Sequence, residues 1–543
     1  MGGSQMKDLS RKEFLRMSAR TTASALAATT VGPYIVSGLT GCTSTSLVKD
    51  MPKVDYRKEI RLVNCRIIDV NAGRIINNGT IRINNGRITA VSDRALPENR
   101  DAEIFNIKNQ YVMPGLINGH CHLTIPAGSY LVSMAKALDL LTQMKRNFSL
   151  NIEHGITTVR DMGGYPGLIR DYIAQSERGN FPGPRVMHSN AFLSVKGGYI
   201  EIDEKDLHPL GSLFVSLMGA GSISTKVTGM KDLQEKIREN IRNAGLIKVS
   251  SMDTKPLVAG KKSVLPVFTD EELAYIFDYA QKNNLPCALH NMTMQAFRRA
   301  IQYPFHSLEH VVVDGYISDA DIATMRKRNI SIVPTVILGN LYACTSSFGE
   351  FPKEFRTDFI MNEIKIRESY WNSVTSGDVV PSIHESNVRA MGWFRQYNYD
   401  YEKMFHDNKL AVDPFPFFNY MIYGVKNVQK MRHAGVLIGC GTDSGVPWNY
   451  HGTLWREMEM YSRIGFTNAE IVRCATMNNA KIMGMDKEIG SIEQGKLADI
   501  IVMKDNPLAD IRAVRDIRLV FLGGKVAAQK CGLVRGDAGI AVG

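Results

Sequence analysis

Two histidines separated by one residue form the most informative chemical pattern in the sequence. His120 and His122 end a strand-like segment that starts with the apolar Leu116 and Ile117, after the turn residues Pro114 and Gly115. Residues i and i+2 of a strand point to the same face, so both imidazoles can be directed at one point. Two neutral imidazoles are good ligands for a first-row metal ion. The pattern predicts a metal site, although two separately hydrogen-bonded histidines would have the same spacing.

Strand-like and helix-like segments alternate between residues 114 and 487, which predicts an α/β fold. The candidate strands are residues 116–117, 155–159, 185–187, 245–249, 286–290, 307–310, 331–334 and 435–439. Helical patterns lie between most of them, for example at 270–280. Eight strands that alternate with helices predict a closed parallel (β/α)8 TIM barrel.

Short β-type runs with turn signals occupy both ends of this region. Residues 58–113 predict a small antiparallel sheet with a turn at Asn84-Asn85-Gly86, and β-type runs return at 488–530. We expect these two parts to form one small β-sandwich domain, followed by a tail at 531–543.

Polar residues end several of the candidate barrel strands. Besides the two histidines, they are Lys248, His290, His310 and Asp443. The active sites of such barrels lie at the C-terminal ends of the strands, so these side chains are expected at one rim. Each has an ordinary alternative, such as a hydrogen bond from His310 to Glu309, or Asp443 as a helix N-cap. Their order on one rim favours a common site.

Residues 338–425 form an insertion that is far longer than a usual barrel connection. It is rich in aromatic residues, including Tyr370, Trp371, Trp393 and Phe394. We expect it to line the pocket as a lid or substrate wall, and an oligomer contact or simple packing is the alternative.

The N-terminus has the features of a targeting segment. Residues 1–41 contain a charged start, a mild apolar stretch and Leu39-Thr-Gly before Cys42, as in a lipoprotein signal peptide. Lipidation of Cys42 would anchor an exported protein to a membrane, facing the periplasm or the cell surface. The start resembles a twin-arginine export motif, with Lys12 in place of the second arginine. Residues 42–57 would be a flexible tether; a chance motif in a disordered N-terminus is the alternative.

Composition excludes several other classes of protein. The net charge is +11 without a long Lys/Arg run or a nucleic-acid-binding motif, which favours a mildly basic solvated surface. The eight cysteines contain no Cys-x-x-Cys pair, so neither a disulfide framework nor a zinc–cysteine site is indicated.

Several motifs together resemble the amidohydrolase superfamily, and within it the prolidase-like and imidazolonepropionase-like branch, over roughly residues 58–530. They are Pro-Gly-Leu-Ile-Asn-Gly-His-Cys-His122, His154-Gly-Ile-Thr-Thr-Val-Arg-Asp161, Leu-Ile-Lys248-Val, Ala-Leu-His290, Ser-Leu-Glu-His310, Gly-Thr-Asp443-Ser-Gly and Gly490-Ser-Ile-Glu-Gln-Gly-Lys-Leu-Ala-Asp499.

The resemblance implies two divalent metal ions, expected as Zn2+. His120, His122 and Asp443 would bind one and His290 and His310 the other. Lys248 would bridge them as a CO2-derived carbamate, since an unmodified ammonium has no acceptor. Asp443 would then act as general base and acid for a metal-activated hydroxide that attacks a carbonyl.

Two positions depart from the pattern of that branch. Lys196-Gly-Gly-Tyr199 stands where relatives often carry Gly-Gly-His, so Tyr199 either replaces the histidine as a catalytic carbonyl donor or the role is absent. Asn291 and Met292 follow His290, where relatives often carry a small residue and then Tyr or His, which makes the expected substrate contact different.

These observations predict a metal-dependent amidohydrolase that cleaves an amide C–N bond in a small molecule such as a dipeptide or N-acyl amino acid. A mononuclear deaminase or cyclic-amide hydrolase on the same scaffold is the first alternative, with Lys248 as a plain structural lysine. A lipoprotein that binds a ligand without turnover is the second. We expect no nucleic-acid partner and no membrane contact beyond the lipid anchor, and a homo-oligomer is possible.

Overall fold

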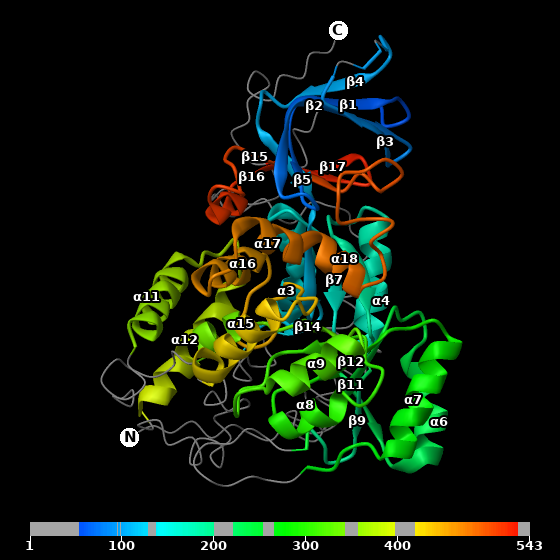
Figure 1. Cartoon of the computed structure of the whole chain (residues 1–543), viewed down its shortest axis with the longest axis vertical. Helices are drawn as coiled ribbons and strands as arrows, with labels where there is room; N and C mark the ends of the chain where they lie inside the picture. The colour runs from blue at the N-terminus through cyan, green and yellow to red at the C-terminus, as the bar shows by residue number, and fades with distance from the viewer. Residues whose placement is uncertain are drawn as a thin grey trace, which may run out of the picture. The chain divides into compact units, whose positions relative to one another are not determined.

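Strands from the two ends of the chain pair with each other in one sheet, the blue and red strands of the computed structural model in Figure 1. The structure describes residues 54–94, 96–97, 99–128, 137–199, 221–253, 265–342, 357–396 and 419–529. All of them belong to the compact unit Met51–Gly543. None of the described helices is long and apolar enough to cross a membrane.

The end-to-end sheet has eight strands in the order β17-β16-β15-β5-β1-β2-β3, with β4 also paired to β1. Their bounds are β1 Ile60–Asp69, β2 Arg74–Asn84, β3 Arg87–Ser92, β4 Glu103–Asn106, β5 Tyr111–Pro114, β15 Ile500–Met503, β16 Ile517–Leu522 and β17 Lys525–Gln529. The expected turn between β2 and β3 is present, with Asn85 and Gly86 at φ 49° and 77°. Only residues that tolerate the left-handed region make so tight a connection cheaply.

A separate apolar cluster lies on this sheet and draws on both ends of the chain. Leu62 and Phe105 come from the first part, and Ile500 and Phe521 from the second. The rings of Phe105 and Phe521 meet edge to face with centroids 5.3 Å apart. The two ends therefore share one core, and the closure of this sheet into a sandwich stays a prediction.

Two parallel sheets make up the middle of the chain. One has the order β6-β7-β8 and the other β10-β9-β11-β12-β13-β14. Their bounds are β6 Leu116–Cys121, β7 Ile156–Asp161, β8 Arg185–His188, β9 Phe192–Val195, β10 Ser224–Val227, β11 Ile247–Ser250, β12 Cys287–His290, β13 Ser307–Glu309 and β14 Ser331–Val333. Seven of the eight expected barrel strands are present, whereas β9 and β10 were not expected.

The break between the two parallel sheets falls at Asn190, between β8 and β9. Its φ of 60° bends the chain, and its side-chain amide donates to the carbonyl oxygens of Asn240 and Arg242. Neither parallel sheet is closed among the described residues. The middle of the chain has a TIM-barrel-like α/β fold, and the continuous closed barrel is not seen.

The expected eighth strand, 435–439, is replaced by isolated bridges. Ile438 bridges to Ile332 next to it, and Ser444 bridges to Cys121. At Cys440 the Asn479 side chain takes the place of a neighbouring strand. It accepts a hydrogen bond from the Cys440 N–H and donates one to the Cys440 carbonyl oxygen. Gly441 permits the close approach to strand β6, because a Cβ there would lie 2.8 Å from the His120 nitrogen.

Helices cover the parallel strands. They are α3 Ala137–Glu153, α4 Pro166–Glu177, α6 Gly229–Asn240, α7 Asp270–Lys282, α8 Met294–Ala300, α9 Asp319–Lys327, α15 Val425–His433, α16 Leu454–Arg463, α17 Asn468–Arg473 and α18 Asn479–Ile482, with π-helix η5 Cys474–Asn478. The 3-10 helix η6 Ile511–Arg515 lies between β15 and β16 in the chain and contacts α16 and α17. The helix predicted at 270–280 is α7, which begins with a capping box between Thr269 and Glu272.

The described part of the insertion is helical. It contains α10 Ile337–Tyr342, α11 Asp358–Ser373, α12 Pro381–Gln396 and the π-helix η4 Tyr420–Gly424. In α11 and α12, Trp371 stacks on His384 with centroids 5.6 Å apart. Several of the insertion's aromatic residues, including Tyr397, Tyr399, Tyr401 and 415–418, lie outside the described residues.

Candidate metal centre

His120, His122 and Asp443 come together at the C-terminal end of strand β6. The Nε2 atoms of His120 and His122 lie 3.2 Å and 2.8 Å from the same oxygen, Oδ1 of Asp443. All three side chains are buried. Because residues i and i+2 of a strand point to the same face, both imidazole rings are directed at one point, the Asp443 carboxylate.

The backbone around Asp443 is fixed by strand β6. The N–H groups of Thr442 and Asp443 both donate to the carbonyl oxygen of His120, at 3.1 Å and 2.8 Å. Asn118 donates from its side chain to the Thr442 hydroxyl at 2.9 Å. Asp443 itself has φ 59°, a conformation that costs free energy unless the surroundings hold it. These bonds hold the carboxylate over the histidine pair.

The remaining expected rings form a continuous series next to this group. The centroids of His120 and His310 are 4.7 Å apart, those of His310 and His290 4.4 Å, and those of His290 and Tyr199 4.7 Å. The serines at 194 and 250 both donate to the Tyr199 carbonyl oxygen, which anchors that residue beside strands β9 and β11.

Lys248 lies in the middle of strand β11, where it is only 1% exposed. Its ammonium nitrogen has no hydrogen-bond partner among the described residues. Burial lowers the pKa of Lys248 to about 8, although Glu309 and Asp443 oppose the shift. A buried cation without a partner is costly, so burial favours the neutral amine, the form that can be modified or can bind a cation.

Burial and mutual repulsion keep two of the histidines neutral. The pKa values of His290 and His310 lie well below the usual range, first because of burial and then because of the neighbouring cationic groups. Burial alone would raise the pKa of Asp443, but His120, His122 and His310 together outweigh it and the pKa falls well below its usual range. Neutral imidazoles beside an ionised carboxylate suit a divalent cation.

Glu309 is a buried residue that the sequence analysis named only as a possible hydrogen-bond partner of His310, in the alternative to a metal site. Its Oε2 accepts from Nδ1 of His120 at 2.8 Å, not from His310. Its Oε1 accepts from Arg160 at 2.6 Å and from the Ser307 hydroxyl at 2.5 Å. Burial alone would raise the pKa of Glu309, but Arg160, His120 and Lys248 together outweigh it and the pKa falls to about 2. Arg160 and Glu309 both stood in the quoted motifs, and only the fold shows that they meet.

Thr335, Gly163 and Asp161 were also missed. Nδ1 of His310 lies 2.7 Å from the Thr335 hydroxyl, and Nδ1 of His122 lies 2.6 Å from the Gly163 carbonyl oxygen. Asp161 accepts from the N–H groups of Leu123 and Gly163, and burial raises its pKa to about 6. All three residues lie at or just after the ends of strands β7 and β14, and this position in the sequence could have marked them as candidates for the site.

The donor set fits a divalent metal ion. One possible ligand atom from each of His120, His310 and Asp443 lies within 4.8 Å of the others. Nε2 of His290 and Nζ of Lys248 are buried and have no hydrogen-bond partner among the described residues. Buried polar atoms are rarely left unpaired, so orphaned atoms here indicate a bound group.

The insertion reaches the segment that follows Asp443. The Asn387 side chain in α12 donates to the Ala127 carbonyl oxygen at 2.9 Å and to the Tyr450 hydroxyl at 2.8 Å. The Trp448 indole donates to the Asn387 carbonyl oxygen at 3.1 Å. The described part of the insertion therefore packs against the backbone that carries the site.

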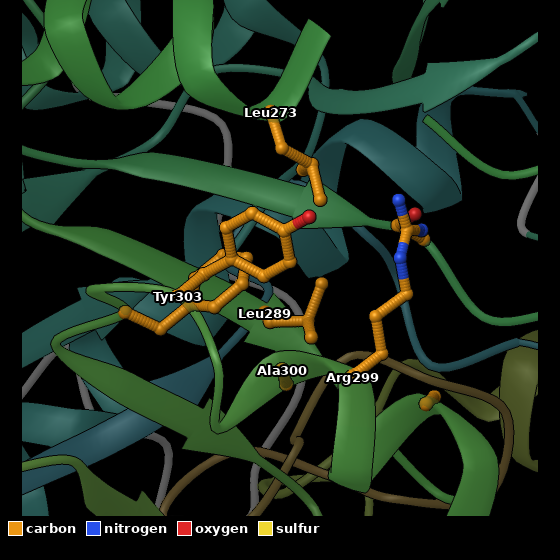
Figure 2. A pocket seen from close by; sticks show the side chains of 8 residues that line it. Leu273, Leu289, Arg299, Ala300 and Tyr303 are labelled. Carbon is orange, nitrogen blue, oxygen red and sulfur yellow. The ribbon is translucent and has the colours of Figure 1, made fainter. Parts of the chain in front are cut away.

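A small cavity lies away from these residues, between α7, α8 and the strands β11 and β12 (Figure 2). Its volume is about 10 Å³, enough for no more than one water molecule. Arg299 and Tyr303 at its edge are both bonded to Asp270. This cavity contains none of the candidate ligands and is not a substrate site.

Residues 111–527 match the amidohydrolase family, which is most of the chain. The chain belongs to the amidohydrolase family. This confirms the resemblance seen in the motifs, and the structural neighbours of this amidohydrolase include prolidases.

Individual relatives are distant. Ochratoxinase of Aspergillus niger is 24% identical over 393 residues, which cover 69% of this chain and 66% of that protein. The chain thus spans slightly less than two thirds of that relative. A deaminase of 5-methylthioadenosine/S-adenosylhomocysteine from Symbiobacterium thermophilum is 38% identical over 89 residues, 14% of this chain and 20% of that one.

Solved structures share the fold at low identity. A Xaa-Pro dipeptidase with bound methionine in its active site is 20% identical, has a TM-score of 0.61, and is matched over 86% of this chain and 99% of its own. The structure of A. niger ochratoxinase is 19% identical with a TM-score of 0.61, over 88% of this chain and 97% of that one.

Proposed function

We propose that this amidohydrolase is a metal-dependent hydrolase that cleaves an amide C–N bond. The observation that carries the proposal is the convergence of His120, His122 and Asp443 beside the buried, unpaired Nζ of Lys248. A site for ligand binding alone would not need a carboxylate held against two imidazoles at the cost of a strained backbone. The same carboxylate is suited to proton transfer.

In this proposal the chain's ligands divide into two groups. His120, His122 and Asp443 would hold one divalent ion, expected as Zn2+, and His290 and His310 would hold the other. Lys248 would be the shared ligand, as the carbamate that forms when its neutral amine adds CO2 and releases a proton to solvent. Bound divalent ions lower the pKa of a water molecule and polarise a carbonyl group. Asp443 would accept a proton at its carboxylate and deliver it to the leaving nitrogen, as general base and then general acid.

The proposed substrate is a dipeptide or an N-acyl amino acid with an apolar acyl part. Phe192 packs on His122 with centroids 5.5 Å apart, and Tyr199 packs on His290, so aromatic rings flank the ligands. Relatives named as a Xaa-Pro dipeptidase and an ochratoxinase support this class. The Tyr199 hydroxyl is proposed to donate to the scissile carbonyl oxygen.

A Lys248→Ala variant tests the two-metal mechanism. Parent protein loaded with Zn2+ is expected to hold two equivalents and to hydrolyse members of a panel of dipeptides and N-acyl amino acids. Lys248→Ala is expected to hold at most one equivalent and to lose most of the activity. Short carboxylic acids with bicarbonate are expected to restore part of it. Lys504→Ala, at an exposed lysine, is the control.

A mononuclear deaminase is the second candidate. Two observations favour it. One cluster of three possible ligand residues, enough for a single metal ion, is formed by His120, His310 and Asp443, and some relatives are named as deaminases. It predicts one equivalent of metal in the fully active parent and little change in Lys248→Ala. That result, with ammonia released from purine nucleosides, would replace the binuclear proposal.

We also propose export and anchoring through Cys42, which lies outside the described residues. The sequence Leu39-Thr-Gly-Cys42 supports lipidation. As a separate proposal on the fold, the two ends of the chain form a β-sandwich and the middle forms a closed barrel. Parent protein is expected to fractionate with membranes and to label with a fatty-acid probe, whereas Cys42→Ala is not. Membrane association of the unlabelled variant would reject a lipid anchor.

A further inference from the structure

The second ring nitrogens of the candidate ligands have partners of different strength. Nδ1 of His120 meets the Glu309 carboxylate at 2.8 Å, whereas Nδ1 of His310 meets the Thr335 hydroxyl at 2.7 Å. A partner of this kind fixes the ring orientation and the tautomer of a histidine ligand. A carboxylate also makes the opposite nitrogen more basic, and a neutral hydroxyl does so far less.

The Glu309 carboxylate is held rigidly across the protein interior. Arg160 of β7 donates to Glu309, to the Ser307 hydroxyl and to the Gly119 carbonyl oxygen, at 2.6 Å, 3.0 Å and 2.7 Å. Ser307 donates in turn to Glu309 at 2.5 Å. Arg160 and Glu309 are 2% and 0% exposed, so neither side chain has room to reorient.

This network joins strands that belong to different sheets. Gly119 and Arg160 lie on β6 and β7, whereas Ser307 and Glu309 lie on β13. The position of the His120 ring is therefore fixed by hydrogen bonds to strands of both parallel sheets. A ligand locked in this way loses little conformational freedom when it binds a cation.

Thr335 supports His310 in a different way. It follows strand β14 with φ 48°, an unusual conformation for a β-branched residue. Its carbonyl oxygen accepts from the N–H of Leu338 at 3.1 Å, and its side chain is fully buried. Its hydroxyl can orient His310, but it adds no charge to the ligand.

We propose that the two metal positions are tuned separately, and that the position at His120, His122 and Asp443 fills first and more tightly. Arg160 and Glu309 are positioning residues for that position, and Thr335 is the positioning residue for the one at His290 and His310. This inference rests on the proposed two-metal function.

Titration of the metal-free full-length protein with Co2+ tests the inference, followed by visible absorption and by equilibrium dialysis. The parent is expected to show a tight event and a weaker event. Glu309→Gln is expected to weaken the tight event about 10–100-fold, the usual cost of losing such a partner, with little change in the weaker one. Thr335→Val is expected to weaken only the weaker event.

Matched controls change the same groups elsewhere. Glu271→Gln on the exposed face of α7 and Thr324→Val on the exposed face of α9 are expected to change neither event. If Glu309→Gln does not fold, Ser307→Ala is the second test, since it keeps the charges of Arg160 and Glu309 and removes only the bonds that the Ser307 hydroxyl makes with these two side chains. It is then expected to weaken the tight event alone.

The number of events separates failure of this inference from failure of the proposed function. Two events that both variants weaken equally, or a tight event that Glu309→Gln leaves intact, overturn the separate tuning and leave the two-metal function standing. A single event in the parent overturns both. A fall in thermal stability of the metal-free variants with unchanged metal affinities would show a structural role only, and it also overturns the inference.

Discussion

Three residues at the rim of the site adopt left-handed backbone conformations without being glycine. His310, Thr335 and Asp443 have φ values of 68°, 48° and 59°. Each such conformation costs of the order of 1–3 kcal/mol and persists only where the surroundings impose it. Their grouping at the ends of strands is consistent with selection for ligand placement over stability.

Tyr199 offers a test of carbonyl polarisation at the scale of one hydroxyl group. Tyr199→Phe keeps the ring against His290, so metal content and thermal stability are expected to stay at the parent values. If the hydroxyl stabilises the developing oxyanion, its loss lowers kcat about 10²–10³-fold. Steady-state kinetics on the best substrate found measures this. An unchanged kcat/KM on every substrate would show that Tyr199 has no electrophilic role.

Sequence reasoning reached the candidate ligands because strand period and strand ends are local properties. His120 and His122 follow from the i, i+2 rule, and Lys248, His290 and His310 from the ends of apolar runs. The partner of His120 did not follow, because Glu309 is 189 positions away and reaches it across the interior. Such contacts depend on the distance between strands, which no local pattern encodes.

At the scale of elements, helix α12 supports the segment after Asp443. Its Asn387 amide bonds the Ala127 carbonyl oxygen, which also accepts from the Trp448 N–H at 3.1 Å. The Ala127 N–H donates to Gly445 at 2.8 Å, two residues beyond Asp443. The insertion thus acts as a brace for the loop that holds the carboxylate.

Asn387→Ala is expected to weaken this brace. It removes two hydrogen bonds from a fully buried side chain, at about 0.5–1.5 kcal/mol each, while the Ala127 carbonyl oxygen keeps its bond from the Trp448 N–H. Thermal denaturation is expected to show a lower Tm, and kcat is expected to fall because Asp443 is held less firmly. Val388→Ser, at the neighbouring 50% exposed position, is the control. Equal effects of the two substitutions would contradict a specific brace.

Element prediction succeeded where apolar runs are flanked by clear turns and failed where side chains replace the backbone ladder. The residues 435–439 have the composition of a strand, but Asn479 occupies the hydrogen-bonding groups of Cys440. β10, with the sequence Ser-Thr-Lys-Val, carries a single apolar residue, and β9 begins at Phe192, soon after β8 ends at His188, so neither stood out as an apolar run of its own. Both cases show tertiary contacts overriding local preference.

At the scale of the whole molecule, strand β5 from the first part of the chain depends on strand β15 from the last part. Strand β5 leads directly into β6, which carries His120, and β15 pairs with β5 from Ile500 opposite Pro114 to Met503 opposite Tyr111. On its other side, β5 meets β1 through Arg66 and Ile67 only. The last part of the chain therefore completes the sheet from which the site strand emerges.

A chain that ends at Lys487 tests this dependence. It lacks β15, β16 and β17, so Leu62, Phe105 and Val112 lose their contacts with Ile500 and Phe521. Each such side chain contributes about 1.5–3 kcal/mol when fully buried, and total stabilities are only about 5–15 kcal/mol. The shortened chain is expected to be insoluble or to lack a cooperative thermal transition.

A chain that ends at Gln529 is the matched control, because it keeps every strand of the sheet and removes only residues beyond β17. It is expected to match the parent in Tm and in metal content. A chain ending at Lys487 that melts like the parent and binds the same metal would show that residues 114–487 fold alone. In that case the pairing of β5 with β15 would be dispensable, and the position of His120 would depend on the parallel strands and on Glu309 only.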